Sequence, residues 1–310
     1  MTEEVVIMRG HVVVGVDGSP AADNAVDWAA DEAVLRGAAL EVLHAWEWTA
    51  YEASDWYGHH LYNDATEITQ VAAERAMRRR PELTVHTSIV HGSAGQVLAD
   101  AGERAQLTVL GSRGRGGFAD LLLGSVGHEV AARGTGPLLV VRADKAFAAP
   151  PPHGEESPTP NATRVTVGIA DETSLLAVEA ALAEAARRRW SVYAVHAWSF
   201  PDVPAFGAAT TGSAPYADAV RECQQYGESI VANTVATARD QHKELVHDVE
   251  VVQDAVNGRR TQVLVDGTRA AALVVIATHR RHGHLGRHLG PVTNALLHHS
   301  HAPVLLIPVD

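Results

Sequence analysis

Short apolar runs alternate along the chain with longer stretches in which apolar residues recur every three or four positions. In the first half, the short runs predict strands near 11–16, 39–46, 84–90, 107–111 and 137–142. The longer stretches predict helices near 20–36, 60–79, 94–105 and 125–133. Runs such as VVVGV and LTVL are almost continuously apolar, as expected of strands buried on both faces. The alternation predicts an α/β fold with helices on both faces of a parallel sheet.

The helix predicted at 20–36 carries signals at both ends. Ser19 is suited to the N-cap, and Pro20 to the first helical position, where no N–H group is needed. Gly37 is placed to end the helix, because glycine adopts the left-handed cap conformation without strain. The face expected to pack on the sheet is an apolar stripe that contains Ala25, Trp28, Ala29 and Leu35.

The sequence contains an internal repeat: its two halves are similar, and they lie on either side of a segment at 143–163 that is rich in proline and polar residues. HVVVGVDGS near the start corresponds to RVTVGIADETS, and LEVLHAWEW corresponds to VYAVHAWSF. QLTVLGSRGRGGFADLLLGSV aligns without gaps on ALVVIATHRRHGHLGRHLGPV. We therefore expect two units of one fold, at 1–145 and 164–310, joined by a linker at 146–163.

Composition narrows the classes of function. The chain has 310 residues, 46% of them hydrophobic, and a formal net charge of −12, which disfavours nucleic-acid binding through general electrostatics. No apolar run approaches the 18 or so residues of a membrane-spanning helix. The one cysteine, Cys223, allows no internal disulfide, and the N-terminus lacks the pattern of a signal peptide. These features lead us to expect a cytoplasmic protein with no membrane partner.

Residues 111–126, GSRGRGGFADLLLGSV, concentrate glycine directly after the fourth predicted strand. In an open parallel sheet, ligands bind beyond the carboxyl ends of the strands, where the winding reverses. Gly111 and Gly114 are expected to let the backbone turn tightly and approach a ligand. Gly124 and Ser125 open the next helix, whose free N–H groups and positive dipole end attract phosphate.

Two common phosphate motifs do not fit this stretch. The chain contains no Gly-Lys-Ser or Gly-Lys-Thr, so a P-loop is excluded, and GRGGFADLLLG contains no GxGxxG. The spacing that is present, G-x2-G-x9-G-S, together with VVVGVDGS at the first strand, resembles the universal stress protein family in its ATP-binding branch. The resemblance covers nearly the whole chain as two tandem units.

The resemblance implies a fold and a ligand. Each unit would be an open five-stranded parallel sheet in the order 3-2-1-4-5 with helices on both faces, and the ligand would be ATP accompanied by Mg²⁺. Asp17 would hold the adenosine part, and the backbone of Ala45 would touch the adenine. The ribose and phosphates would be received by Gly111, Gly114, Gly124, Ser125 and Val126.

The second unit does not keep the motif. Ala170, Ala277, Arg280 and Pro291 stand opposite Asp17, Gly111, Gly114 and Ser125. Pro291 removes both a hydroxyl and an N–H donor from the start of the helix. An acidic residue, Asp171, lies one position after the expected one. We therefore predict a second unit with the same fold and a degenerate nucleotide site.

Other polar residues are interpreted as structural. Arg113 and Arg115 are expected to face solvent rather than to contact phosphate. His44 and His196 are expected in the core, as are the tryptophans at 28, 46 and 198. Seven histidines lie between 279 and 301, but their spacing is irregular and no carboxylate or cysteine falls among them. No metal site is predicted there.

The expected function is that of an ATP-binding universal stress protein with a regulatory or protective role, in which the first unit holds the nucleotide. No catalytic set is recognised; slow ATP hydrolysis stays open. Two alternatives remain: a nucleotide-dependent ligase or transferase on a similar fold, and a nucleotide-free interaction protein. The two apolar fifth strands, PLLVVR at 137–142 and PVLLIP at 303–308, are expected to pair with each other within the chain. A homodimer is left open.

Overall fold

The computed structural model describes residues 10–47, 55–114, 123–142, 163–200, 214–279, 281–283 and 286–309. The strands of the first unit are β1 (Val12–Gly15), β2 (Leu40–Trp46), β3 (Val85–His91), β4 (Leu107–Gly111) and β5 (Leu138–Val141). Its helices are α1 (Pro20–Arg36), α2 (Asp55–Arg79), α3 (Ala94–Gly102) and α4 (Ser125–Arg133). Each strand and helix predicted for this half is present. The largest difference is that α2 begins at Asp55 rather than near 60.

The second unit follows the same order of elements. Its main strands are β6 (Arg164–Gly168), β7 (Ser191–Trp198), β8 (Val251–Asn257), β9 (Leu273–His279) and β12 (Val304–Val309). Its main helices are α5 (Leu175–Arg188), α6 (Ala214–Gln241), α8 (Arg260–Gly267) and α9 (Pro291–His299). Short additions are the turns η3 (Glu172–Ser174) and η4 (Thr268–Ala270), helix α7 (Lys243–Val246), and a hairpin of β10 (Arg281–Gly283) and β11 (Gly286–His288). The predicted linker lies outside the described residues, apart from its last residue.

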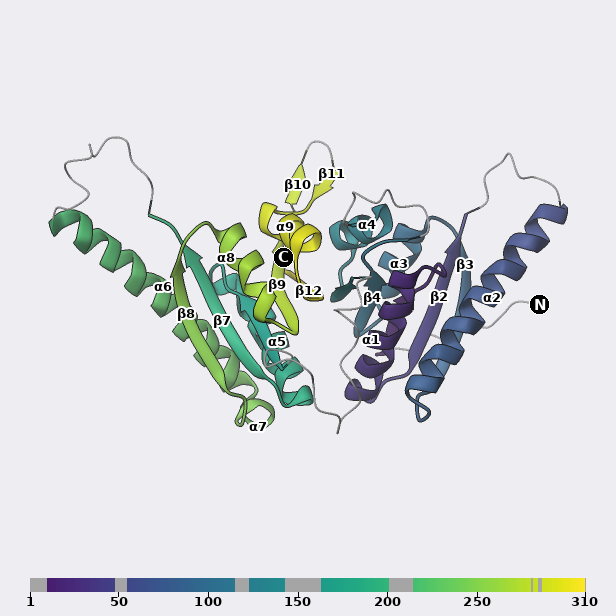
Figure 1. Ribbon diagram of the computed structural model, residues 1–310, viewed down its shortest axis with the longest axis horizontal. Helices are drawn as coiled ribbons and strands as arrows, with labels where there is room; N and C mark the ends of the chain where they lie inside the picture. The colour runs from purple at the N-terminus through teal and green to yellow at the C-terminus, as the bar shows by residue number, and fades with distance from the viewer. Residues whose placement is uncertain are drawn as a thin grey trace.

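The two units share one sheet of ten strands, in the order β3-β2-β1-β4-β5-β12-β9-β6-β7-β8. Each half is parallel and has the predicted order 3-2-1-4-5. The halves meet where β5 and β12 pair antiparallel, with Leu139 opposite Leu305. This pairing confirms the expectation that the two apolar edge strands cover each other. Figure 1 shows the result, two similar halves on either side of a central seam.

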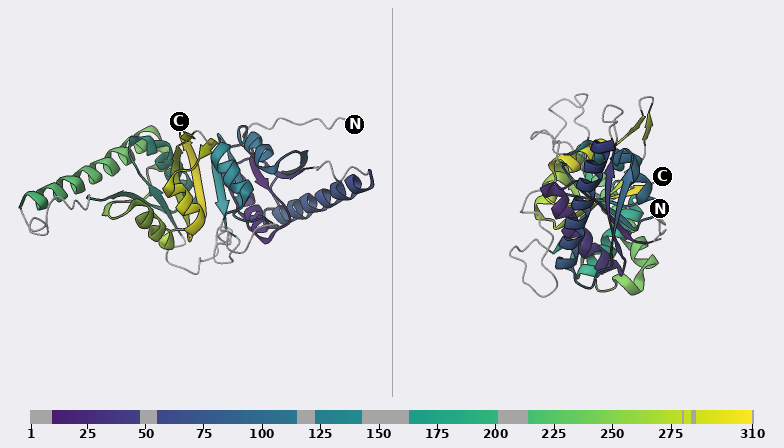
Figure 2. Two further views of the ribbon diagram at one scale, coloured as in Figure 1. Left: turned by 90° about the horizontal axis from the view of Figure 1, so that it is seen from above. Right: turned by 90° about the vertical axis from the view of Figure 1, so that its right-hand side faces the viewer.

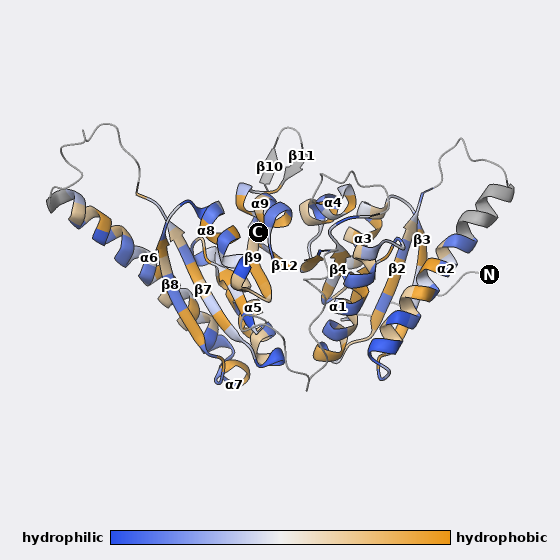
Figure 3. Cartoon of the chain, viewed as in Figure 1, coloured by the Kyte–Doolittle hydropathy of each residue, from blue (hydrophilic) through white to orange (hydrophobic). Residues whose placement is uncertain are grey.

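Helices cover both faces of the sheet, and each face has its own core. One core gathers residues of α1, α2, α5, α6 and α7, and the other gathers residues of α3, α4, α8 and α9. Alternate residues of each strand point to opposite faces of the sheet. In β1, for example, Val12 and Val14 belong to the first core and Val13 belongs to the second. Both cores contain residues of both units, so the hydrophobic interior is continuous across the seam. The strands are accordingly mostly hydrophobic in Figure 3.

The ends of α1 match their sequence signals. Ser19 Oγ accepts a hydrogen bond from the N–H of Ala22 at 3.2 Å, and Pro20 is the first helical residue. Gly37 ends the helix in the left-handed conformation, with φ 60° and ψ 34°. Trp28 is fully buried, as predicted. Figure 2 shows α2 and α6 running outward at opposite ends of the molecule. None of the described helices is long and apolar enough to cross a membrane.

Candidate functional site

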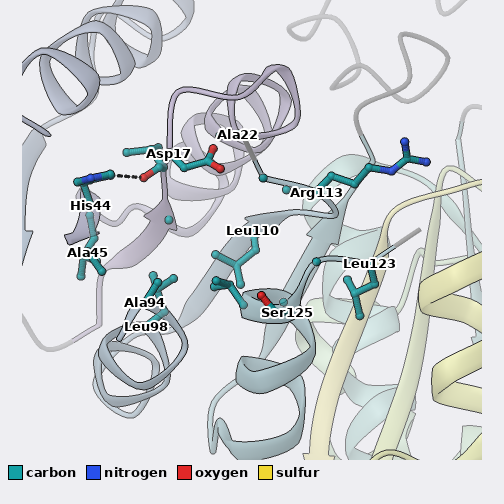
Figure 4. A pocket seen from close by; sticks show the side chains of 18 residues that line it. Asp17, Ala22, His44, Ala45, Ala94, Leu98, Leu110, Arg113, Leu123 and Ser125 are labelled. Atoms are coloured by element: carbon teal, nitrogen blue, oxygen red, sulfur yellow. Dashed lines mark hydrogen bonds between the residues drawn. The ribbon is translucent and has the colours of Figure 1, made fainter. Parts of the chain in front are cut away.

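A cavity of about 530 Å³ lies in the first unit, at the carboxyl ends of β1 and β4. These two strands are neighbours at the point where the winding of the unit reverses, which is where open parallel sheets bind ligands. The walls come from the ends of β1, β2 and β4, from the first turns of α1, α3 and α4, and from the segment that precedes α4. Figure 4 shows the lining side chains.

The seven residues singled out from the sequence converge on this cavity. Its lining includes Asp17, Ala45, Gly111, Gly114, Gly124, Ser125 and Val126. They come from three strand ends and one helix start that are far apart in the sequence. The fold therefore brings together the groups that the motif predicts to act together.

Asp17 is held at the rim by its own loop. Its Oδ1 accepts a hydrogen bond from the N–H of Ser19 at 3.0 Å, and Gly18 between them has a φ of 75°. The hydroxyl of Ser19 in turn donates to the carbonyl of Arg113 at 3.3 Å. Asp17 therefore closes this local turn and also lines the cavity. The bond fixes the carboxylate without removing it from the cavity.

Gly111 and Gly114 lie close against neighbouring protein groups. A Cβ at Gly111 would lie 2.7 Å from the carbonyl carbon of Ala21, so β4 approaches the first turn of α1 too closely for any side chain. A Cβ at Gly114 would lie 2.5 Å from Asp17 Oδ2. Neither residue has a positive φ. Besides the expected ligand approach, which stays a prediction, these glycines make room for α1 and for the Asp17 carboxylate.

The start of α4 forms the polar floor of the cavity. Gly124 is the N-cap and supplies no side chain to cap the helix. The first intrahelical bond runs from His128 N–H to Gly124 O at 3.0 Å, so the N–H groups of the three residues between them have no partner within the helix. Those residues, Ser125, Val126 and Gly127, all line the cavity. Their N–H groups and the helix dipole suit this floor to an anion.

The opposite wall of the cavity is apolar. Leu43 and Ala45 of β2 and Ala94 and Leu98 of α3 contribute to this wall. Both leucines are almost fully buried. A flat, largely apolar group therefore finds a matching surface at one end, and an anion finds N–H donors at the other.

His44 belongs to this wall, although the sequence placed it in the core. It is half-buried, lines the cavity, and has Nδ1 2.7 Å from the carbonyl of Val16. Its counterpart His196 is buried as expected and makes the same bond, to Ile169, at 3.0 Å. The alternation of side chains along a strand could not distinguish His44 from His196. Their difference in exposure depends on how the surrounding loops cover the end of each strand. Arg113 also lines the cavity.

The corresponding region of the second unit is built differently. The 3₁₀ turn η3 precedes α5, so the helix starts later than α1 does relative to its strand. The hydroxyl of Thr173 hydrogen-bonds Asp171 at 2.5 Å and lies 3.1 Å from Nε2 of His279. The bond from Thr173 is the main cause that lowers the pKa of Asp171. Asp171 thus serves the turn, and Pro291 occupies the first position of α9.

The order of the strands, the pairing of helices on both faces and the cavity at the switch point define a tandem, doubly wound α/β protein. The chain belongs to the universal stress protein family: the model of that family matches residues 8–142 and again residues 161–308.

Relatives and solved structures agree with this assignment. The chain is 31% identical over 304 residues to a universal stress protein of Mycobacterium tuberculosis, covering 95% of this chain and 96% of the relative. It is 32% identical to another from the same organism, covering 96% of each. A universal stress protein of Archaeoglobus fulgidus shares the fold, with a TM-score of 0.67 and 15% identity over 96% of this chain and 98% of that one.

Proposed function

We propose that the first unit binds ATP. We further propose that this universal stress protein has a regulatory or protective role that depends on whether the nucleotide is bound. The observation that carries the proposal is the convergence of the predicted motif on one cavity. Seven residues chosen from the glycine spacing and the family resemblance line a space of about 530 Å³, within the range of small-molecule sites. The cavity has an apolar wall and a floor of helix N–H groups, which match a base and a phosphate.

Each part of the nucleotide has a suitable surface. The adenine is assigned to the wall formed by Ala45, Ala94 and Leu98, with the backbone of Ala45 available for hydrogen bonds. Asp17 is the carboxylate that would accept hydrogen bonds from the ribose hydroxyls or adenosine nitrogens. The phosphates are assigned to the start of α4, where Ser125 adds a hydroxyl donor.

Mg²⁺ is assigned to the phosphates and water, since this ion keeps several waters and prefers few protein ligands. Asp17 is the carboxylate of the lining, and its Oδ1 already accepts the N–H of Ser19. The chain therefore contributes the cradle for the phosphates, and the metal supplies charge neutralisation when it is bound with them.

The second unit is assigned a structural role. In this unit, α9 begins with a proline, and the carboxylate of Asp171 accepts a hydrogen bond within the turn η3. It contributes β12 to the seam and half of each core. A ligase or transferase would need a second reactive group held against the phosphates, and no contact among the described residues favours one. The reducing cytoplasm suits a chain with a single cysteine.

Two measurements test the proposal. Nucleotide released from heat-denatured protein is identified by mass spectrometry, and ATP with Mg²⁺ is titrated calorimetrically into nucleotide-free protein. We expect ATP and one site per chain, because one unit keeps the motif. Two equivalent sites would contradict the degeneracy of the second unit. No binding of ATP, ADP or AMP would favour the nucleotide-free interaction protein.

A further inference from the structure

The backbone of Arg113 is held directly beside the start of α4. On one side of it, Ser112 donates its N–H to the carbonyl of Val141 at 2.7 Å and accepts the N–H of the N-cap Gly124 at 2.8 Å. The carbonyl of Arg113 itself accepts the hydroxyl of Ser19 at 3.3 Å. A Cβ at Gly124 would lie 3.9 Å from the Cα of Arg113. The side chain of Arg113 therefore starts from a fixed point next to the free N–H groups of α4.

Arg113 also brings positive charge to the cavity. Among the described residues of the lining, it is the one arginine or lysine, and Asp17 is the one carboxylate. Arg113 is half-buried, and Figure 4 shows its side chain extending outward from the loop, on the side away from His44. No carboxylate in the described part of the chain forms an ion pair with it. A guanidinium in this position is available to an anionic ligand.

The equivalent position in the second unit is arranged differently. His279 aligns with Arg113, and its Nε2 lies 3.1 Å from the hydroxyl of Thr173 in η3. In the first unit, the corresponding loop before α1 bonds to the backbone carbonyl of Arg113, through Ser19. The first unit therefore anchors the backbone at this position and leaves the side chain available, whereas the second unit engages the side chain.

We propose that Arg113 makes the cavity selective for nucleoside polyphosphates over monophosphates. The inference rests on the proposed nucleotide function. The free N–H groups and the Ser125 hydroxyl at the start of α4 can surround one phosphate group. Rotation of the Arg113 side chain about its own bonds brings the guanidinium to the further phosphates, to which its planar fork can donate two parallel hydrogen bonds. A monophosphate offers no group at that point, so Arg113 adds affinity for ATP and ADP and little for AMP.

The test is calorimetric titration of full-length, nucleotide-free protein with ATP, ADP and AMP in excess Mg²⁺. The parent should bind ATP and ADP more tightly than AMP. Arg113→Gln should weaken ATP binding by about five- to twentyfold, because it removes charge-assisted hydrogen bonds at a partly solvated site. The same variant should change the AMP affinity by less than about twofold. Arg113→Lys should lie between the parent and Arg113→Gln, because lysine keeps the charge and loses the fork.

The matched control is Arg104→Gln. Arg104 is exposed and precedes β4, whereas the cavity lies beyond the opposite end of that strand. The control removes the same charge and should leave all three affinities unchanged, which separates a local contact from an effect of net charge. Without nucleotide, Arg113→Gln should keep the thermal midpoint of the parent, because no ion pair among the described residues is lost with it.

Four outcomes would overturn the inference. If Arg113→Gln weakens ATP and AMP binding equally, or leaves both unchanged, Arg113 does not set the selectivity, and the proposed nucleotide function stands. If Arg104→Gln weakens ATP binding as much as Arg113→Gln does, the effect belongs to the net charge. If the parent binds ATP, ADP and AMP equally, the cavity has no selectivity for polyphosphates. If the parent binds none of the three, the proposed function fails, and this inference fails with it.

Discussion

Arg36 of the first unit donates a hydrogen bond to Glu184 of the second, with Nη2 2.5 Å from Oε1, and both side chains are at most 7% exposed. The mirror relationship is also present, because Arg188 of the second unit pairs with Glu32 of the first. The two pairs occupy equivalent positions of α1 and α5, and both join the first unit to the second. The guanidinium of Arg188 also lies over the rings of Trp28 and Trp190.

Glu184→Gln is expected to destabilise the protein by about 3–5 kcal/mol, because it leaves the buried Arg36 and Arg188 with one carboxylate, Glu32, between them. Urea unfolding followed by circular dichroism measures the change. Arg221→Ala serves as the control, since Arg221 pairs with Asp218 at an exposed site where both side chains are at least 60% exposed. It should cost less than about 1 kcal/mol. Replacing all four buried charges by apolar residues should cost less than Glu184→Gln alone; a larger cost would show that the ion pairs themselves stabilise the seam.

Acid is expected to weaken the seam through the same residue. Burial alone would raise the pKa of Glu184, but the charges of Arg36, Arg188 and Arg187 outweigh it and lower the pKa. A carboxylate with a lowered pKa in the folded state contributes stability above its unfolded pKa, about 4.3, and loses it as the pH falls through the folded value. The free energy of unfolding of the parent should therefore fall steeply as the pH is lowered from 6 to 3. Glu184→Gln should have a shallower slope, and an identical slope would assign the acid sensitivity to other carboxylates.

Much of the fold could be predicted because its signals are local or repeated. The caps at Ser19 and Gly37 set the ends of α1, and the apolar runs set the strands. The duplication then supplied each element twice, and the two apolar edges predicted the seam. The buried charges of that seam could not be predicted. Glu32 and Glu184 look like ordinary helix-surface residues in the sequence, and only the meeting of α1 with α5 buries them.

All seven residues expected at the nucleotide site line one cavity. The glycine spacing after a strand indicated where the loop and the next helix begin, and the family resemblance indicated Asp17 and Ala45. The reason for Gly111 and Gly114 lies in atoms of α1 and of Asp17, which are distant in the sequence. His44 was missed for a similar reason, because its strand pattern is that of a core residue. Such features depend on tertiary contacts that no local pattern encodes.

Gly114→Ala and Asp17→Ala are each expected to weaken ATP binding, and their effects should not add. The new Cβ of Gly114→Ala would sit 2.5 Å from Asp17 Oδ2 and must displace the carboxylate. Asp17→Ala removes that carboxylate and costs about 1–3 kcal/mol of binding if its contact is charge-assisted. Because both act through one group, the double variant should bind about as weakly as the weaker single variant. Gly290→Ala is the control, since its Cβ would meet nothing within 4 Å. Additive losses would show that Gly114 acts independently of Asp17.

Ser125→Pro tests whether the second unit shows how the site is lost. Proline is compatible with the first helical position, and α9 already begins with Pro291 behind a glycine N-cap of nearly the same conformation as Gly124. The variant should therefore fold with a thermal midpoint close to that of the parent. It removes one N–H donor and one hydroxyl from the start of α4, and hydrogen bonds to a charged group contribute about 1.5–3 kcal/mol each. ATP affinity should fall about tenfold to a hundredfold, or more if both donors bind phosphate.

The matched variant Pro291→Ser restores these donors in the second unit, where η3 and the loss of the aspartate at the end of the first strand remain. It should create no second site, and a titration that gives two sites per chain would show that this proline alone had silenced the second unit.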